Sequence, residues 1–453
     1  MTQRALFASH ALLPTGWATN VLLEWDATGT LTRADAGAAA PVGVEQAAGI
    51  LLPGLPNLHS HAFQRAFAGL TEYRDQAADS FWTWRDLMYR FALAVSPEQL
   101  EDIATHLYIE MLAAGYTSVC EFHYLHHDRS GQPFADAAEM SRRIVAAARR
   151  AGIGLTLLPV LYQHSGFGAA PPREDQRRFI HSVEGLLRIV ESLRADGVRA
   201  GVAPHSLRAV APAVLNDLLA GVHRLDPTAP VHLHIAEQQQ EVQDCVAWCG
   251  QRPVHWLLDH VPIDARWCLV HATHLDDRER DGLAASGAVA GLCPSTEANL
   301  GDGLFDAARF AGRWGIGSDS HASVDAAEEL RLLEYGQRLV QQQRNVLAGA
   351  AHPQVAEAMW LAAVAGGAQA AGRPVAGLAV GEQADLVVLA DTLLDGLTPA
   401  QQLAGHVFAS HRRSNVRDVW VAGQRRVQNG GHQGAPAAAQ RFVAARTRLL
   451  AEV

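Results

Sequence analysis

The chain has 453 residues, 49% of them hydrophobic and 19% charged, and this length accommodates a (β/α)8 barrel of roughly 250 residues together with a smaller domain. All 37 basic residues are arginines, which excludes mechanisms that need a Schiff-base or phosphate-binding lysine and metal sites bridged by a modified lysine. The net charge of −10 without a basic tract argues against a nucleic-acid partner, and the absence of a long apolar stretch or a secretory leader predicts a cytoplasmic protein that does not enter a membrane.

Both ends of the chain have a different character from its middle. Residues 1–52 and 373–430 are rich in turn residues and contain short β-like runs such as "DLVVLA" and "DVWVAGQRRV". We expect them to form one small β-sandwich from two pieces of chain. Residues 431–453 read as a terminal helix, which leaves residues 53–372 for the larger domain.

Within residues 53–372, short apolar runs alternate with longer helix-like segments. The runs are apolar throughout, as expected for strands covered on both faces by helices. One intervening stretch, residues 96–115, has a capping Ser96, a Pro97 in the first turn and a closing Gly115, which is typical of a helix. This alternation predicts an α/β fold with an eight-stranded (β/α)8 TIM barrel, its strands near residues 54–61, 118–127, 153–164, 199–206, 231–237, 268–274, 289–295 and 315–322.

Polar residues interrupt several of these runs at their ends, where a barrel carries its reactive groups. Because side chains alternate along a strand, His59 and His61 point to the same side and can bind the same metal ion. Imidazoles together with a carboxylate suit Zn²⁺ or a neighbouring first-row dication and leave room for water. The other strand ends offer His232, His234, Glu237, His271 and Asp319.

Each of these signals has a simpler explanation when it is taken alone. The His-x-His spacing arises by chance among 22 histidines, and His232 or His271 is typical of a packed core histidine. Asp319 fits a helix cap. Cys245 and Cys249, one helical turn apart, are interpreted as packed free thiols rather than shared ligands. The joint occurrence at four strand ends nevertheless favours a metal centre.

The stretches "LPNLHSH", "HLHIAE", "LVHATH" and "GIGSDSH" resemble the amidohydrolase superfamily, and the resemblance covers nearly the whole chain. It implies a metal-bearing barrel beside a β-sandwich made from both termini. Without lysine, the chain looks like the branch that holds one divalent metal ion. The resemblance implies His59, His61, His234 and Asp319 as metal ligands, and Glu237, His271 and Asp319 as catalytic groups that orient water or move protons.

Longer stretches, among them "HSHAFQRAFAGL", "FWTWRDLMY" and "CPSTEANLGDGLF", are similar to the formimidoylglutamate deiminase family of histidine degradation. The implied reaction is hydrolysis of N-formimino-L-glutamate to N-formyl-L-glutamate and ammonia, with an activated water attacking the formimino carbon. By this similarity Gln64 contacts the formimino group, whereas Arg85, Tyr124, His205 and Arg208 hold the glutamate carboxylates. The family also implies a homodimer.

The residue chemistry agrees with that substrate, since planar guanidinium groups match carboxylates in pairs of hydrogen bonds. Either arginine taken alone is also typical of a structural ion pair, and Tyr124 of a core residue. Zn²⁺ is the expected metal, although iron and manganese accept the same ligands. Two alternatives stay open. One is a deaminase for a purine, pyrimidine or other aromatic ring, and the other is an inactive barrel that serves as a scaffold.

Overall fold

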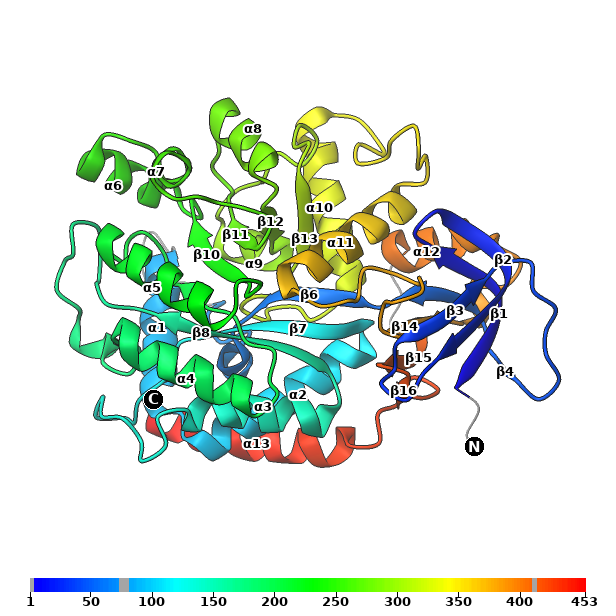
Figure 1. The fold of residues 1–453 in the computed structure, drawn as a ribbon, viewed down its shortest axis with the longest axis horizontal. Helices are drawn as coiled ribbons and strands as arrows, with labels where there is room; N and C mark the ends of the chain where they lie inside the picture. Colours follow the sequence, from blue (N-terminus) through cyan, green and yellow to red (C-terminus); the bar gives the residue numbers. More distant parts are fainter. Residues whose placement is uncertain (1–3, 73–80, 410–413) are drawn as a thin grey trace.

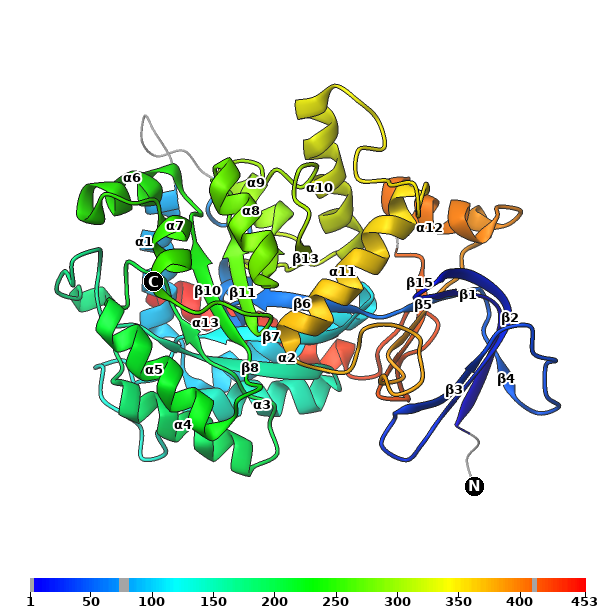
Figure 2. The same cartoon turned by 45° about the horizontal axis from the view of Figure 1, so that its top comes forward.

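The computed structural model describes residues 4–72, 81–409 and 414–453, and only the backbone of residues 81–83. Figures 1 and 2 show two parts, a strand barrel ringed by helices and a smaller β region that contains the N-terminus. The β region lies on the side of the barrel away from α4 (Val183–Ala195) and α5 (Pro212–Leu225). The predicted α/β fold class is confirmed.

All eight apolar runs form parallel strands, each within or overlapping the predicted range. Two four-stranded sheets, β6 to β9 and β10 to β13, are joined by parallel bridges between Val202 and Val231 and between Ser60 and Asp319, which close the barrel. The strands are β6 (Leu55–Ser60), β7 (Tyr116–His123), β8 (Gly154–Leu161), β9 (Ala203–Pro204), β10 (Val231–Ile235), β11 (Trp267–His271), β12 (Val289–Leu292) and β13 (Arg313–Ile316).

The helix predicted after Ser96 begins at its predicted cap. In α2 (Pro97–Ala113), the Ser96 hydroxyl accepts a hydrogen bond from the Gln99 backbone N–H, and the Gln99 side-chain oxygen accepts one from the Ser96 backbone N–H, which satisfies two of the free N–H groups at the helix start. The remaining helices around the barrel are α3 (Glu139–Ala151), α6 (Gln239–Cys249), α7 (Pro253–His260), α8 (Asp277–Ser286), α9 (Pro294–Leu300), α10 (Ala326–Gln341) and α11 (Val355–Ala371). Over the strand ends lie η1 (Ala62–Phe67), α1 (Phe81–Ala94) and η2 (Glu174–Gln176).

Both termini build the small β region, whose strands are hydrogen-bonded as one continuous sheet. Its order is β16-β15-β14-β5-β1-β2-β3, with β4 paired to β1. Alternate side chains of β5 serve two cores, since Leu51 packs in a cluster within the β region and Leu52 joins the barrel core. The strands are β1 (Ala5–Leu13), β2 (Gly16–Trp25), β3 (Leu31–Asp35), β4 (Glu45–Gln46), β5 (Ile50–Pro53), β14 (Leu386–Leu389), β15 (Val416–Val421) and β16 (Gln424–Val427).

The second β segment also contains two elements that its β-like composition did not predict, η3 (Thr392–Leu394) and α12 (Pro399–Phe408). Thr398 and Gln401 form a capping box around Pro399, and these local signals start a helix between β14 and β15. The terminal helix α13 (Ala435–Glu452) returns from the β region to pack along α2 (Figure 1). Among the described helices, none is both long and apolar enough to span a membrane.

Candidate metal centre and active site

A cavity of about 580 Å³, open to solvent, lies at the carboxyl ends of the barrel strands. The position follows from the chain direction, because parallel strands place their carboxyl ends, and the loops that follow them, at one end of a barrel. Of the residues that the sequence predicted for the site, all except the fully buried His59 line it: His61, Gln64, Arg85, Tyr124, His205, Arg208, His234, Glu237, His271 and Asp319.

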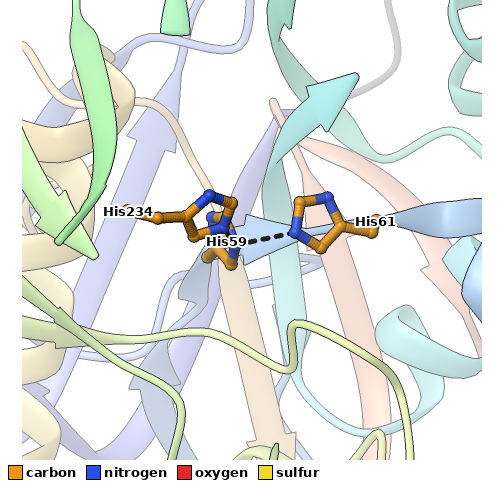
Figure 3. Close-up of side chains that lie close together, drawn as sticks. All are labelled: His59, His61 and His234. Atoms are coloured by element: carbon orange, nitrogen blue, oxygen red, sulfur yellow. Dashed lines mark hydrogen bonds between the residues drawn. The ribbon is translucent and has the colours of Figure 1, made fainter. Parts of the chain in front are cut away.

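Three imidazoles converge on one another (Figure 3), and two of them, those of His61 and His234, line the cavity. His59 lies in β6, His61 follows it directly, and His234 comes from β10. The Nε2 atom of His59 is 3.1 Å from Nε2 of His61 and 3.0 Å from Nε2 of His234. Nitrogen ligands at 2.0–2.1 Å from a tetrahedral ion lie about 3.3 Å apart, so this spacing matches a shared cation.

The tautomers of two of these rings support the same interpretation. His61 donates from Nδ1 to the Phe122 carbonyl at 2.9 Å, and His234 donates from Nδ1 to the His205 carbonyl at 3.2 Å. Because a neutral imidazole carries one N–H, both Nε2 atoms present lone pairs. Burial lowers the pKa of His59 to about 3 and also lowers those of His61 and His234, which favours the neutral, metal-binding form. Both lone pairs face Nε2 of His59, an arrangement that suits a shared cation in place of a proton on that nitrogen.

Asp319 supplies a carboxylate to this cluster from the loop after β13. Its Oδ1 lies 3.3 Å from Nε2 of both His59 and His61. Burial raises the pKa of Asp319, but the hydrogen bond from His59 and the surrounding imidazoles outweigh it and lower the pKa. Asp319 and His271 both have left-handed backbones, with φ of 47° and 67°. Such strained conformations in non-glycine residues cluster at functional sites, where packing holds them in place.

A buried carboxylate, that of Glu121, stabilises the backbone at the end of the first barrel strand, β6. Glu121, in β7, accepts hydrogen bonds from the Ser60 hydroxyl at 2.6 Å and from the Ala62 N–H at 2.7 Å. Gly317 allows the β13 end to pass close to His59, since a Cβ there would lie 2.8 Å from the His59 Cβ and N. These contacts fix the backbone that carries His59 and His61.

Next to the histidine cluster, Glu237 and His271 form a pair of proton-carrying groups. His271 Nε2 lies 3.7 Å from Glu237 Oε1 and 3.8 Å from Asp319 Oδ2. Burial raises the pKa of Glu237 to about 7. Burial lowers the pKa of His271, but the carboxylates of Glu237, Glu297 and Asp319 outweigh it and raise the pKa to about 10. Both groups can therefore hold a proton near neutral pH.

Cationic side chains occupy another part of the cavity lining. The Arg208 Nε is buried, and the nearest carboxylate oxygen, Oε1 of Glu241, is 3.9 Å away, beyond hydrogen-bond distance. A buried guanidinium in this position favours an anionic ligand. Arg85, on α1, also lines the cavity and lies over the ring of Tyr89.

Two neutral groups, Gln64 and His205, also line the cavity. Gln64 donates from Nε2 to the Tyr124 hydroxyl at 2.9 Å, and its buried Oε1 has no partner among the described residues. The ring of His205 packs 5.0 Å from that of His234 and 4.5 Å from that of Tyr162. The lining of one cavity thus combines metal-binding imidazoles, neutral hydrogen-bonding groups and two arginines.

Several lining residues were missed by the sequence reasoning. Tyr162 follows β8, so the strand-end rule that identified Tyr124 would also have identified it, and Tyr89 lies one helical turn after Arg85. His232 lies outside the metal cluster and bonds to the Ala370 carbonyl at 2.8 Å, as a packed histidine. Cys245 and Cys249 are free thiols with Sγ atoms 4.0 Å apart. The other missed lining residues are Trp84, Met88, Phe179 and Leu300.

Two family profiles match the chain. Residues 50–426 match the profile described as "Amidohydrolase family", which spans more than half of the sequence. Residues 3–48 match the profile described as "Formimidoylglutamate deiminase HutF, N-terminal domain". The two matches together cover the first β segment, the barrel and most of the second β segment.

Similar proteins and solved structures agree with the two family profiles. The formimidoylglutamate deiminase of Pseudomonas aeruginosa is 54% identical over 457 aligned residues, which cover 98% of this chain and 99% of that protein. The crystal structure of an amidohydrolase from Brucella melitensis is 50% identical, has a TM-score of 0.94 and covers 99% of this chain and 100% of its own. An adenosine deaminase from Xanthomonas campestris with bound zinc is 23% identical with a TM-score of 0.80, covers 99% and 98% of the two chains, and shows a shared fold alone.

Proposed function

The chain belongs to the amidohydrolase family, and on that premise we propose that it hydrolyses N-formimino-L-glutamate to N-formyl-L-glutamate and ammonia in histidine degradation. The observation that carries the proposal is a single cavity that joins a three-imidazole cluster to two arginines. A linear amidine with two carboxylates needs both features, since water must be activated at one end and a dianionic tail held at the other.

We assign one divalent ion to His59, His61, His234 and Asp319, and the three-imidazole, one-carboxylate donor set favours Zn²⁺. Such an ion supplies Lewis-acid activation of water, whose pKa falls from 15.7 toward about 7 when it is bound. The donor set also accepts iron and manganese. The amidohydrolase family is metal-dependent. We propose in addition that this chain binds a single ion and that the ion is Zn²⁺.

The remaining site residues then have roles set by their positions. His271 lies within 3.8 Å of both Glu237 and Asp319, so it orients the attacking water, and Asp319 orients or deprotonates that water. Glu237 passes a proton to the departing nitrogen, so that ammonia leaves rather than amide anion. The free Oε1 of Gln64 accepts a hydrogen bond from the formimino nitrogen. Arg85, Arg208, Tyr124 and His205 bind the carboxylates.

The alternative is a deaminase for a purine, pyrimidine or other aromatic ring, the activity named for the Xanthomonas campestris structure. The same metal end serves both reactions, and the aromatic rings lining this cavity offer stacking faces. The buried Arg208 favours the formimino substrate, because its Nε lies 3.9 Å from Glu241 without a hydrogen-bond partner among the described residues and a neutral ring brings no carboxylate to it. An inactive scaffold has no need for a complete set of metal-binding side chains, so the presence of that set in this chain favours an enzyme.

The direct test is ammonia release by the metal-loaded enzyme from N-formimino-L-glutamate, with cytosine, guanine and adenosine assayed in parallel. We expect ammonia and N-formyl-L-glutamate in equal amounts from the first substrate only. Release of glutamate and formamide would mean that a different bond is broken. Turnover of a ring substrate alone would favour the alternative.

We also propose that the protein is a homodimer and that it is located in the cytoplasm.

Replacing Arg208 with lysine tests the tail-binding part of the cavity. Lysine keeps the positive charge but loses the planar pair of donors, so we expect KM to rise by roughly tenfold or more with a smaller change in kcat. Steady-state kinetics with N-formimino-L-glutamate measure both constants. The control is Arg188→Lys on α4, a solvent-exposed arginine paired with Glu184. An unchanged KM in Arg208→Lys would remove Arg208 from substrate binding.

A further inference from the structure

Three buried polar side chains beside the cavity have no role in the proposal above: Tyr89 on α1, Tyr162 after β8 and Gln176 in η2. We propose that the Tyr162 hydroxyl donates a hydrogen bond to a carboxylate of the substrate tail, and that Gln176 positions it for this purpose together with Tyr89. The inference rests on the proposed function, because it requires a carboxylate between Arg85 and Arg208. It adds a specificity-determining tyrosine and a positioning glutamine to the site.

The orientation of the Gln176 amide follows from its backbone partner. The Arg173 N–H donates to Gln176 Oε1 at 2.8 Å. A backbone N–H can only donate, so this side of the amide must be the oxygen. The amide nitrogen therefore faces the two tyrosines and donates to the Tyr162 hydroxyl at 2.9 Å and to the Tyr89 hydroxyl at 3.2 Å.

The two phenol oxygens therefore act as acceptors toward Gln176 and keep their own hydrogens. Burial raises the pKa of Tyr162 well above its usual value, and the neighbouring Tyr89 adds to this, so the hydroxyl stays protonated. The two phenols carry two hydrogens, and a bond between them uses only one. At least one hydrogen is left to point elsewhere, and both tyrosines line the cavity.

We assign the free hydrogen to Tyr162 rather than to Tyr89, and the charges around the Tyr162 hydroxyl indicate what that hydrogen meets. Arg208 and Arg85 both act electrostatically on the Tyr162 hydroxyl, each in the direction of a lower pKa. The guanidinium of Arg85 lies 5.5 Å from the centre of the Tyr89 ring, and the Tyr162 ring lies 4.5 Å from that of His205. A carboxylate held by these cations lies beside the hydroxyl, which adds a directional, neutral donor to two charged ones.

The first experiment replaces Tyr162 with phenylalanine, which removes only the hydroxyl. Loss of one hydrogen bond to a charged group raises KM by roughly tenfold or more. The formimino group binds at the metal end, so kcat should change much less. Tyr335→Phe is the matched control, because Tyr335 is a half-exposed residue on α10 that stacks on Phe408.

The second experiment replaces Gln176 with glutamate, which has nearly the same shape but reversed polarity. The carboxylate still accepts from the Arg173 N–H, but its other oxygen accepts from the tyrosine hydroxyls and draws their hydrogens away from the cavity. We expect a rise in KM similar to that of Tyr162→Phe. If Gln176 acts through Tyr162, the same change made in the Tyr162→Phe background should add much less than it does alone.

The outcomes separate this inference from the proposed function. If the wild-type enzyme releases ammonia from N-formimino-L-glutamate but Tyr162→Phe keeps KM within twofold, the inference is wrong and the proposed function stands. If the wild-type enzyme does not use this substrate, both are wrong. Should Gln176→Glu fail to fold because of its buried charge, Tyr162→Phe alone decides the question.

Discussion

Replacing His234 with asparagine should lower kcat/KM for N-formimino-L-glutamate by at least about 10⁴-fold and reduce the bound metal to a trace. His234 Nε2 lies 3.0 Å from His59 Nε2, so its loss removes one of the converging imidazoles. Activation of water accounts for the size of the effect, because free water has a pKa of 15.7 and supplies almost no hydroxide at pH 7. Steady-state kinetics and elemental analysis of the purified protein measure the two quantities.

Thermal unfolding gives a readout that does not depend on turnover. An ion that binds only the folded protein stabilises it according to its concentration and affinity. Zinc added to the chelator-treated wild-type protein should therefore raise the Tm, and the increase should be lost in His234→Asn. The control is His223→Asn, since His223 is an exposed residue of α5. Full metal content together with full activity in His234→Asn would show that His234 is not a ligand.

Replacing Glu237 with glutamine should reduce kcat by roughly 100-fold to 10,000-fold and leave the metal in place. Glutamine keeps the size of the side chain but cannot pass a proton to the leaving nitrogen. The wild-type group suits this task, because burial raises its pKa to about 7 and it can gain and lose a proton near neutral pH. Its nearest basic partner, His271 Nε2, lies 3.7 Å away.

The metal content of Glu237→Gln separates a lost proton transfer from a lost ion. Glu184→Gln on α4 is the control, because that carboxylate is exposed and paired with Arg188. If Glu237→Gln retained its metal and turned over at a rate near that of the wild type, another group would have to carry the proton. His271 and Asp319, which flank the water site in the proposed arrangement, would then be the next candidates.

Much of this site could be predicted from the sequence because its polar residues stand at the ends of the predicted strands. An apolar run buried on both faces is a local signal, and each of the eight runs became a barrel strand. The polar residues at the ends of parallel strands then meet at one end of the barrel. For this reason His59, His61, His234, His271 and Asp319 could be brought together without a structure, and the resemblance to a known family supplied their expected roles.

Residues outside the strands could not be placed in this way. Gln176 lies in the short η2 segment between β8 and α4, and no pattern in the sequence connects it with Tyr89, 87 positions earlier in the chain. Glu121 has a clear place in β7, but its role behind the first strand appears only once its carboxylate is seen to accept from Ser60. The fold between distant segments determines such pairs.

Hydrophobic periodicity and strand direction are properties of short segments, so the order of the elements, the fold class and the strand-end groups able to hold a metal could be predicted from the sequence. The distances between those groups required the folded chain. The Nε2 atoms of His59 and His234 belong to residues 175 positions apart and meet only because the barrel closes. Distance and burial between distant segments depend on packing, which short-range sequence patterns do not encode.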